Sequence, residues 1–181
     1  MTEVSMNKNM KLSEHFTLGE LTKTSYKTED GNIPSRVAIE NLKNLCENWL
    51  EDLRYSYNSL FPRDYSQDTV AEPAALDQRS LATNGTQEAP LIINSGYRSP
   101  EVNKRAGGSA TSNHLTGCAV DIRVGGFEQA IRYASILLDI SDGTKRDFDE
   151  LYIERNGAGR YWIHFAVRPK DNRRKVGFLQ T

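Results

Sequence analysis

The feature that most constrains the fold is a set of three side chains that could bind one metal ion. His114 and Asp121 flank Gly117 in a short stretch, and His164 lies in the apolar and aromatic run 161–167. Imidazole nitrogen and carboxylate oxygen are zinc ligands, and a catalytic zinc site uses three protein ligands and keeps one position open. A buried histidine also needs a polar partner. A fold that uses all three residues must bring these two distant segments together.

Simpler interpretations of the same residues exist. His114 and Asp121 alone would also suit a hydrogen-bonded pair in the core. Cys118, close to both in sequence, is a further candidate for a ligand or nucleophile, but Cys118 and Cys46 are better explained as small buried hydrophobic residues, because two cysteines make no disulfide framework. His15 lies in a polar setting that is typical of the surface, so we place it outside the site.

Length and charge narrow the class of protein. A chain of 181 residues suits one domain, and we expect it to span 12–181 and to be a monomer. A net charge of -1 gives no electrostatic reason to expect nucleic acid or a membrane surface as partner, and no apolar run reaches the ~20 residues of a membrane span. Residues 1–11 are polar and expected to be flexible. They lack the apolar middle of a secretion signal, so we expect synthesis in the cytoplasm.

Helix signals dominate the first part of the chain. Thr17 with Glu20 forms a capping box and predicts a short helix. Apolar residues recur at three- and four-residue steps from Val37 to Leu53, which predicts a long amphipathic helix with its apolar side in the core. The pattern then dissolves into polar residues between 62 and 90. We interpret them as an insertion that is either a flap over a cleft or, as we favour, a solvated excursion.

The second part alternates strands with helices. We expect strands at 91–95 and 119–124, a helix at 101–106 that begins after Ser99 and Pro100, and a second helix at 127–140. Arg98 lies at the corner between the first strand and its helix, from which it can point into a cleft or pair with a nearby carboxylate. A hairpin of 151–155 and 161–167 ends the pattern. The predicted fold class is α+β, a small antiparallel sheet with helices packed on one face.

The register of this hairpin decides which acid faces the metal ligands. If the turn is the three-residue loop 157–159, Glu154 opposes Trp162, and both share a face with His164. A slip of one residue would turn Glu154 away. Glu150 has the same parity as Glu154, whereas Asp149 should face the other side.

Together these residues are the parts of a metal-dependent hydrolase. A bound zinc takes the pKa of its water to about 7 and polarises a carbonyl. Glu154 would accept the proton of the water and pass it to the leaving amine. Arg98 would hold a substrate carboxylate or stabilise the oxyanion.

Three segments also carry a family resemblance. They are Ser95-Gly96-Tyr97-Arg98-Ser99, then Ser112-x-His114-x2-Gly117-x-Ala119-x-Asp121, and Trp162-Ile163-His164. They resemble the zinc D-Ala-D-Ala carboxypeptidase family, which includes phage L-alanyl-D-glutamate endolysins and shares its α+β fold with the hedgehog signalling domain. The resemblance extends from about Phe16 to Val167.

The resemblance implies a role for each matching residue. His114, Asp121 and His164 would bind Zn2+, Arg98 would bind substrate or stabilise the transition state, and Ser112 would support the site by hydrogen bonding. Apart from the resemblance, Trp162 is better explained as a wall of the cleft or a core residue than as a specific reader of substrate.

The catalytic base is where the chain departs from the family pattern. Many members carry the catalytic glutamate three residues before the last histidine, where this chain has Tyr161. We therefore assign the base to Glu154, as in a branch with a Phe-Asp-x-Leu strand, here 148–151, and keep Glu150 as the alternative.

The implied function is hydrolysis of peptidoglycan stem peptides next to a D-amino acid, of the carboxypeptidase or the endolysin type. A phage or prophage product of this kind would reach the cell wall after lysis, through a holin or in the virion. The alternative is a zinc-containing binding module of the same fold without hydrolysis. An acid that faces the metal favours the enzyme.

Overall fold

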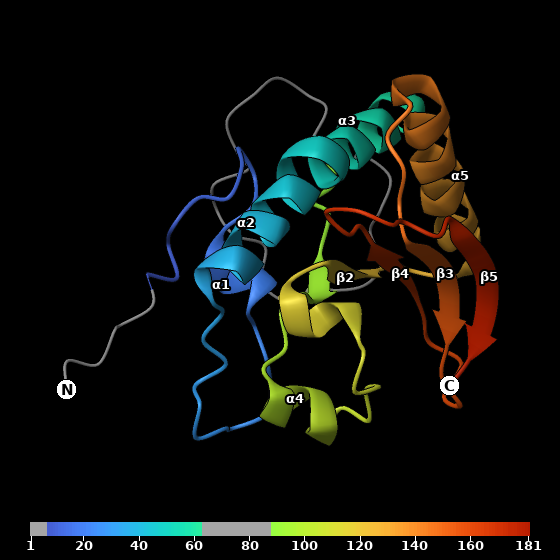
Figure 1. Cartoon of the computed structure of the whole chain (residues 1–181). Helices are drawn as coiled ribbons and strands as arrows, with labels where there is room; N and C mark the ends of the chain where they lie inside the picture. Colours follow the sequence, from blue (N-terminus) through green and yellow to red (C-terminus); the bar gives the residue numbers. More distant parts are fainter. Residues whose placement is uncertain (1–6, 63–87) are drawn as a thin grey trace.

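The computed structural model describes residues 7–62 and 88–181 and has the predicted α+β fold (Figure 1). Residues 1–6 of the expected flexible segment and residues 63–87 of the expected insertion lie outside the described residues. Residues of 7–11 hydrogen bond to the first helix region, where Gly19 N donates to Lys8 O at 2.8 Å and Leu18 N to Met10 O at 2.9 Å. None of the helices within the described ranges is both long and apolar enough to cross a membrane.

The helices begin where the sequence supplies caps. Thr17 and Glu20 form the predicted capping box of α1 (Leu18–Leu21). Ser99 caps α4 (Pro100–Arg105), and Pro100 takes the first turn, where its missing N–H costs no helical hydrogen bond. The helix predicted at 127–140 is α5 (Phe127–Thr144), which ends at Lys145 in the left-handed conformation.

The long amphipathic helix is confirmed and continues beyond its predicted end. α2 (Arg36–Leu45), a π-helical segment (Cys46–Leu50) and α3 (Glu51–Leu60) form one continuous rod (Figure 1). Its apolar side is buried, and the ring of Trp49 lies 5.0 Å from that of Phe165 in the sheet. Val37 departs from the predicted stripe and is exposed. Ala38 takes the inward position in the first turn, and the side chain of Val37, one residue earlier, points about 100° away from it around the helix axis.

Within residues 7–62 and 88–181, the sheet has five strands in the order β1-β2-β4-β3-β5. Their bounds are β1 (Ile93–Ser95), β2 (Ala119–Arg123), β3 (Glu150–Arg155), β4 (Tyr161–Ala166) and β5 (Lys175–Gln180). β3 and β4 pair in the predicted register, with Glu154 opposite Trp162 and Tyr152 opposite His164. β2 pairs antiparallel with β4 and sets Asp121 opposite His164.

The sheet is mixed, so the expectation of an antiparallel sheet was wrong at one edge. β5, which was not predicted, runs parallel to β3. β4 and β5 run in opposite directions on either side of β3, so the loop 167–174 only has to cross the end of β3 beside Glu150. This crossing places the loop against the residues that precede and begin β3.

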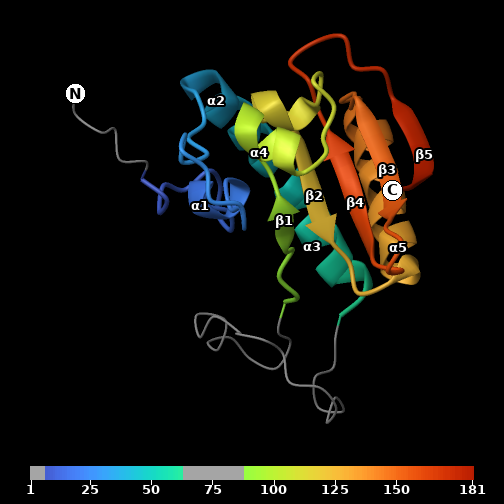
Figure 2. The same ribbon diagram turned by 90° about the horizontal axis from the view of Figure 1, so that it is seen from below.

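The two faces of the sheet have different roles. Val120, Ile122, Ile163 and Phe165 belong to the buried core, and Figure 2 shows α3 and α5 behind the sheet on this side. The shorter α4 lies on the other side, towards the viewer. Asp121 and His164 alternate with these core residues and therefore project from the face opposite α3 and α5.

Candidate metal centre

A tight turn places His114 at the edge of this open face. The residue lies in a 3-10 helix, Asn113–Thr116, where Ser112 Oγ accepts from His114 N at 3.3 Å. Gly117 ends the turn with a φ of 70°, and a Cβ there would lie 2.4 Å from Ala38 O. Only glycine combines this backbone conformation with so close an approach of α2. The turn is thus fixed against the helical rod before β2 begins.

The imidazole of His114 is oriented by the backbone. Its Nδ1 lies 2.6 Å from the carbonyl oxygen of Gly96, and the residue is 2 % exposed. A carbonyl only accepts, so Nδ1 carries the proton and donates it. Nε2 is the other ring nitrogen and faces Asp121 Oδ1 at 3.3 Å, so it is the atom that His114 offers to a metal ion. This is how metal-binding histidines are commonly held.

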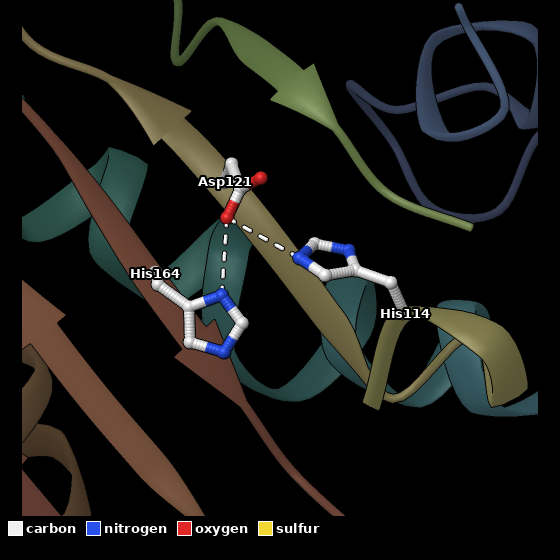
Figure 3. Close-up of side chains that lie close together, drawn as sticks. All are labelled: His114, Asp121 and His164. Atoms are coloured by element: carbon white, nitrogen blue, oxygen red, sulfur yellow. Dashed lines mark hydrogen bonds and ion pairs between the residues drawn. The ribbon is translucent and has the colours of Figure 1, made fainter. Parts of the chain in front are cut away.

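The three predicted ligands come together around one oxygen atom (Figure 3). Asp121 Oδ1 lies 3.3 Å from His114 Nε2 and 3.0 Å from His164 Nδ1. One ligand atom from each residue lies within 4.8 Å of the other two. Two atoms bound at about 2.1 Å to a tetrahedral zinc lie about 3.4 Å apart. Both the donor types and their spacing therefore fit zinc.

The charges of the cluster depend on one another. Burial opposes the ionised form of Asp121, but the neighbouring His114 and His164 outweigh it and hold the pKa of this carboxyl far below its usual value. Burial likewise opposes protonated His164, yet its hydrogen bonds to Asp121 and Glu150 raise its pKa to about 9. Without metal, the cluster therefore keeps a proton on His164 at neutral pH, and a metal ion must displace it.

Arg98 lies beside the ligands and is held from two sides. Its Nη2 donates to Asp121 Oδ2, and its Nε donates to Ser95 Oγ at 2.8 Å. It thus makes the carboxylate pair that the sequence left open as an alternative. It also lines a cleft of about 260 Å³ with Asp121 and Trp162, and residues 23–26 line the same cleft. The guanidinium therefore reaches both the ligands and the space where a substrate would bind.

The two candidate bases have different surroundings. Burial raises the pKa of Glu154, against the smaller opposing influence of His164, Trp162 and Arg98. Glu150 Oε2 lies 3.4 Å from His164 Nε2, and hydrogen bonding to His164 lowers the pKa of Glu150. Glu150 is also paired with Arg173 at 2.7 Å. Of the two acids, Glu154 thus takes up a proton more readily.

Two further residues that the sequence suggested, Ser112 and Cys118, lie outside the set of three metal ligands. Ser112 acts as the cap of the His114 turn and lines a separate hollow of about 350 Å³ with Asn113 and Arg168. Cys118 is buried, with its Sγ 3.9 Å from Thr116 O. Across the described part of the chain, the group able to hold a metal comprises His114, Asp121 and His164, and Cys118 is not among them.

Sequence reasoning missed three residues that organise the centre. Gly96 supplies the carbonyl that orients His114, but any residue type has such a carbonyl. Asn113 and Arg173 both hydrogen bond to Asp149 and Glu150. The only signal for these contacts was the parity that placed Glu150 on the face of His164.

A sequence model of the peptidase M15 family matches residues 68–145. This part of the chain is therefore similar to peptidase M15 sequences. The match covers less than half of the chain and includes Arg98, His114 and Asp121, but it ends before His164. The fold supplies the third ligand from β4, outside the matched range. No curated protein matches the chain.

Proposed function

We propose that the protein is a zinc-dependent peptidase that hydrolyses peptidoglycan stem peptides next to a D-amino acid. The convergence of His114 Nε2, Asp121 Oδ1 and His164 Nδ1 beside a cleft carries the metallopeptidase part of this proposal. The family match supports the same class. The substrate rests on the resemblance of the sequence motifs to cell-wall peptidases. The chain would act on the wall once lysis, a holin or the virion brings it there.

Zinc would be held by His114, Asp121 and His164, and when bound it would activate a water molecule and polarise the scissile carbonyl. Glu154 projects from the face that carries these ligands, because it lies two residues from Tyr152, which opposes His164. Its carboxylate takes the proton of the attacking water and returns it to the leaving amine. The pKa of Glu154, raised by burial, brings it closer to the range in which a carboxylate both accepts and donates a proton.

Arg98 and Trp162 shape the substrate side. The Arg98 side chain is mostly buried, and its donors are fixed by Ser95 and Asp121 before any substrate arrives. Such preorganised cations stabilise a developing oxyanion more than water does. Trp162 lines the same cleft and limits how a peptide can lie across the ligands.

The test is Glu154→Gln, assayed by release of amino groups from purified peptidoglycan. The amide keeps the shape of the side chain but cannot accept the proton, so hydrolysis should fall by about 10²- to 10⁴-fold with zinc content unchanged. Glu128→Gln is the matched control, since Glu128 pairs with Arg132 on the exposed side of α5. Its activity should equal that of the unmodified chain.

Two results would contradict the proposal. Equal activity of Glu154→Gln and the unmodified chain would exclude Glu154 as the base. If neither protein releases amino groups while each holds one zinc ion, the non-catalytic binding module is the better description.

A further inference from the structure

The acid Glu150 lies behind His164, on the side away from the other two ligands. Its Oε2 is 3.4 Å from His164 Nε2, while His164 Nδ1 is 3.0 Å from Asp121 Oδ1. The imidazole ring is therefore enclosed by a carboxylate at each nitrogen. Only one of the two nitrogens can keep its lone pair for a metal ion, so these neighbours decide which.

Glu150 is in turn held by two donors from distant segments. Asn113 Nδ2 donates to Glu150 Oε2 at 2.9 Å, and Arg173 Nη2 donates to Glu150 Oε1 at 2.7 Å. Both donors also bind Asp149, which is fully buried. Asn113 reaches Asp149 Oδ2 at 2.8 Å, and Arg173 Nε reaches Asp149 Oδ1 at 2.7 Å. A fork of guanidinium and amide thus fixes two adjacent carboxylates in one geometry.

The origin of these donors links three parts of the chain. Asn113 immediately precedes the ligand His114, and Arg173 comes from the loop 167–174 that crosses the end of β3. The same arginine also bonds through its backbone, with Arg173 N donating to Asp149 Oδ1 at 3.2 Å. The crossing loop is therefore fastened directly behind the ligand set.

We infer that Glu150 is a positioning residue, held by Arg173 and Asn113, that keeps the proton of His164 on Nε2 and so presents Nδ1 to the metal. This gives Glu150 a role other than catalytic base. It also gives the crossing loop 167–174 a function in metal binding, although no residue of that loop is a ligand. The inference rests on the proposed zinc centre, but it does not depend on peptidase activity or on the substrate.

The first test is the zinc affinity of Glu150→Gln, measured by competition with a chromophoric chelator. An amide offers one acceptor oxygen to three donors and can turn its own N–H groups towards His164, so affinity should fall by about 10- to 100-fold. In the zinc-loaded unmodified chain, ¹⁵N spectra of the imidazole should show His164 protonated at Nε2. In the variant, this single pattern should be lost. Glu128→Gln should change neither measurement.

The second test uses the loop and does not depend on the folding of the first variant. Arg173→Lys keeps the charge but cannot reach both carboxylates at once. It should weaken zinc binding several-fold. Arg174→Lys is the matched control, since the neighbouring Arg174 pairs with Asp142 instead. It should leave zinc affinity unchanged.

Unchanged zinc affinity and an unchanged His164 spectrum in Glu150→Gln would overturn the inference, as would equal effects of Arg173→Lys and Arg174→Lys. These failures are distinct from failure of the proposed function. Failure of the proposed function would appear in the unmodified chain, which would then bind no zinc or hydrolyse no peptidoglycan.

Discussion

Removing the imidazole of His164 should change how the stability of the metal-free protein depends on pH. The hydrogen bonds to Asp121 and Glu150 raise the pKa of His164 from 6.5 to about 9, and its side chain is only 12 % exposed. A raised pKa contributes stability that is fully present below the unfolded value and is lost as pH rises through the folded value. The relevant window is therefore about pH 6.5 to 9.

The size of the effect follows from the same pKa values. At 1.36 kcal/mol per pH unit, the interval from 6.5 to about 9 corresponds to about 3 kcal/mol. The chelated chain should therefore lose about 3 kcal/mol more unfolding free energy between pH 6 and pH 9.5 than His164→Gln does. Asp121 does not contribute in this range, because its pKa stays far below its usual value and it remains ionised.

Urea unfolding of both chelated proteins at pH 6, 7.5 and 9.5 measures this difference. Comparing the two proteins cancels the titration of groups that they share. Parallel pH profiles would refute the tight coupling of His164 to Asp121. With saturating zinc, the unfolding free energy of the unmodified chain should instead rise with pH over this window. Zinc competes with the proton on His164 and therefore binds better as pH rises.

Three further changes test other parts of the structure. Gly117→Ala should destabilise the protein by about 1–3 kcal/mol in urea unfolding, because the φ of Gly117 is 70° and the new Cβ would meet Ala38 O. The control Gly143→Ala in α5 should stabilise the protein by up to about 1 kcal/mol. An unchanged unfolding free energy for Gly117→Ala would show that the turn tolerates a side chain. Arg98→Gln should lower peptide hydrolysis by about 10²- to 10³-fold while one zinc remains bound, and loss of the metal instead would make Arg98 a support of the ligand Asp121. Chelation of the unmodified chain should lower its thermal midpoint, since ligands from separate segments lose their common ion; an unchanged midpoint after verified zinc removal would separate the site from the fold's stability.

Much of the architecture follows from short-range patterns. The capping box at Thr17, the Ser99-Pro100 helix start and the apolar spacing up to Leu53 each act within a few residues, so they are visible in the sequence. The hairpin register was also predictable, because Gly157–Gly159 fixes the loop length and strand parity fixes the faces. The predicted register places Glu154, Trp162 and His164 on one face of the hairpin, and the strands pair in this register.

The missed features depend on contacts between distant segments. β5 is an edge strand whose apolar residues Val176 and Phe178 are exposed, and among the described residues it pairs with β3 alone, so its place depends on a contact with a segment about 25 residues earlier in the chain. The π-helical segment has no sequence signature of its own. The contact of Arg173 with Asp149 and Glu150 arises only because the loop 167–174 crosses the end of β3.

Anomalous scattering at the zinc edge from crystals of the zinc-loaded protein tests the central claim most directly. We predict one peak per chain, within about 2.0–2.2 Å of His114 Nε2, Asp121 Oδ1 and His164 Nδ1. A peak at other residues, or no peak in protein that contains zinc by elemental analysis, would contradict it.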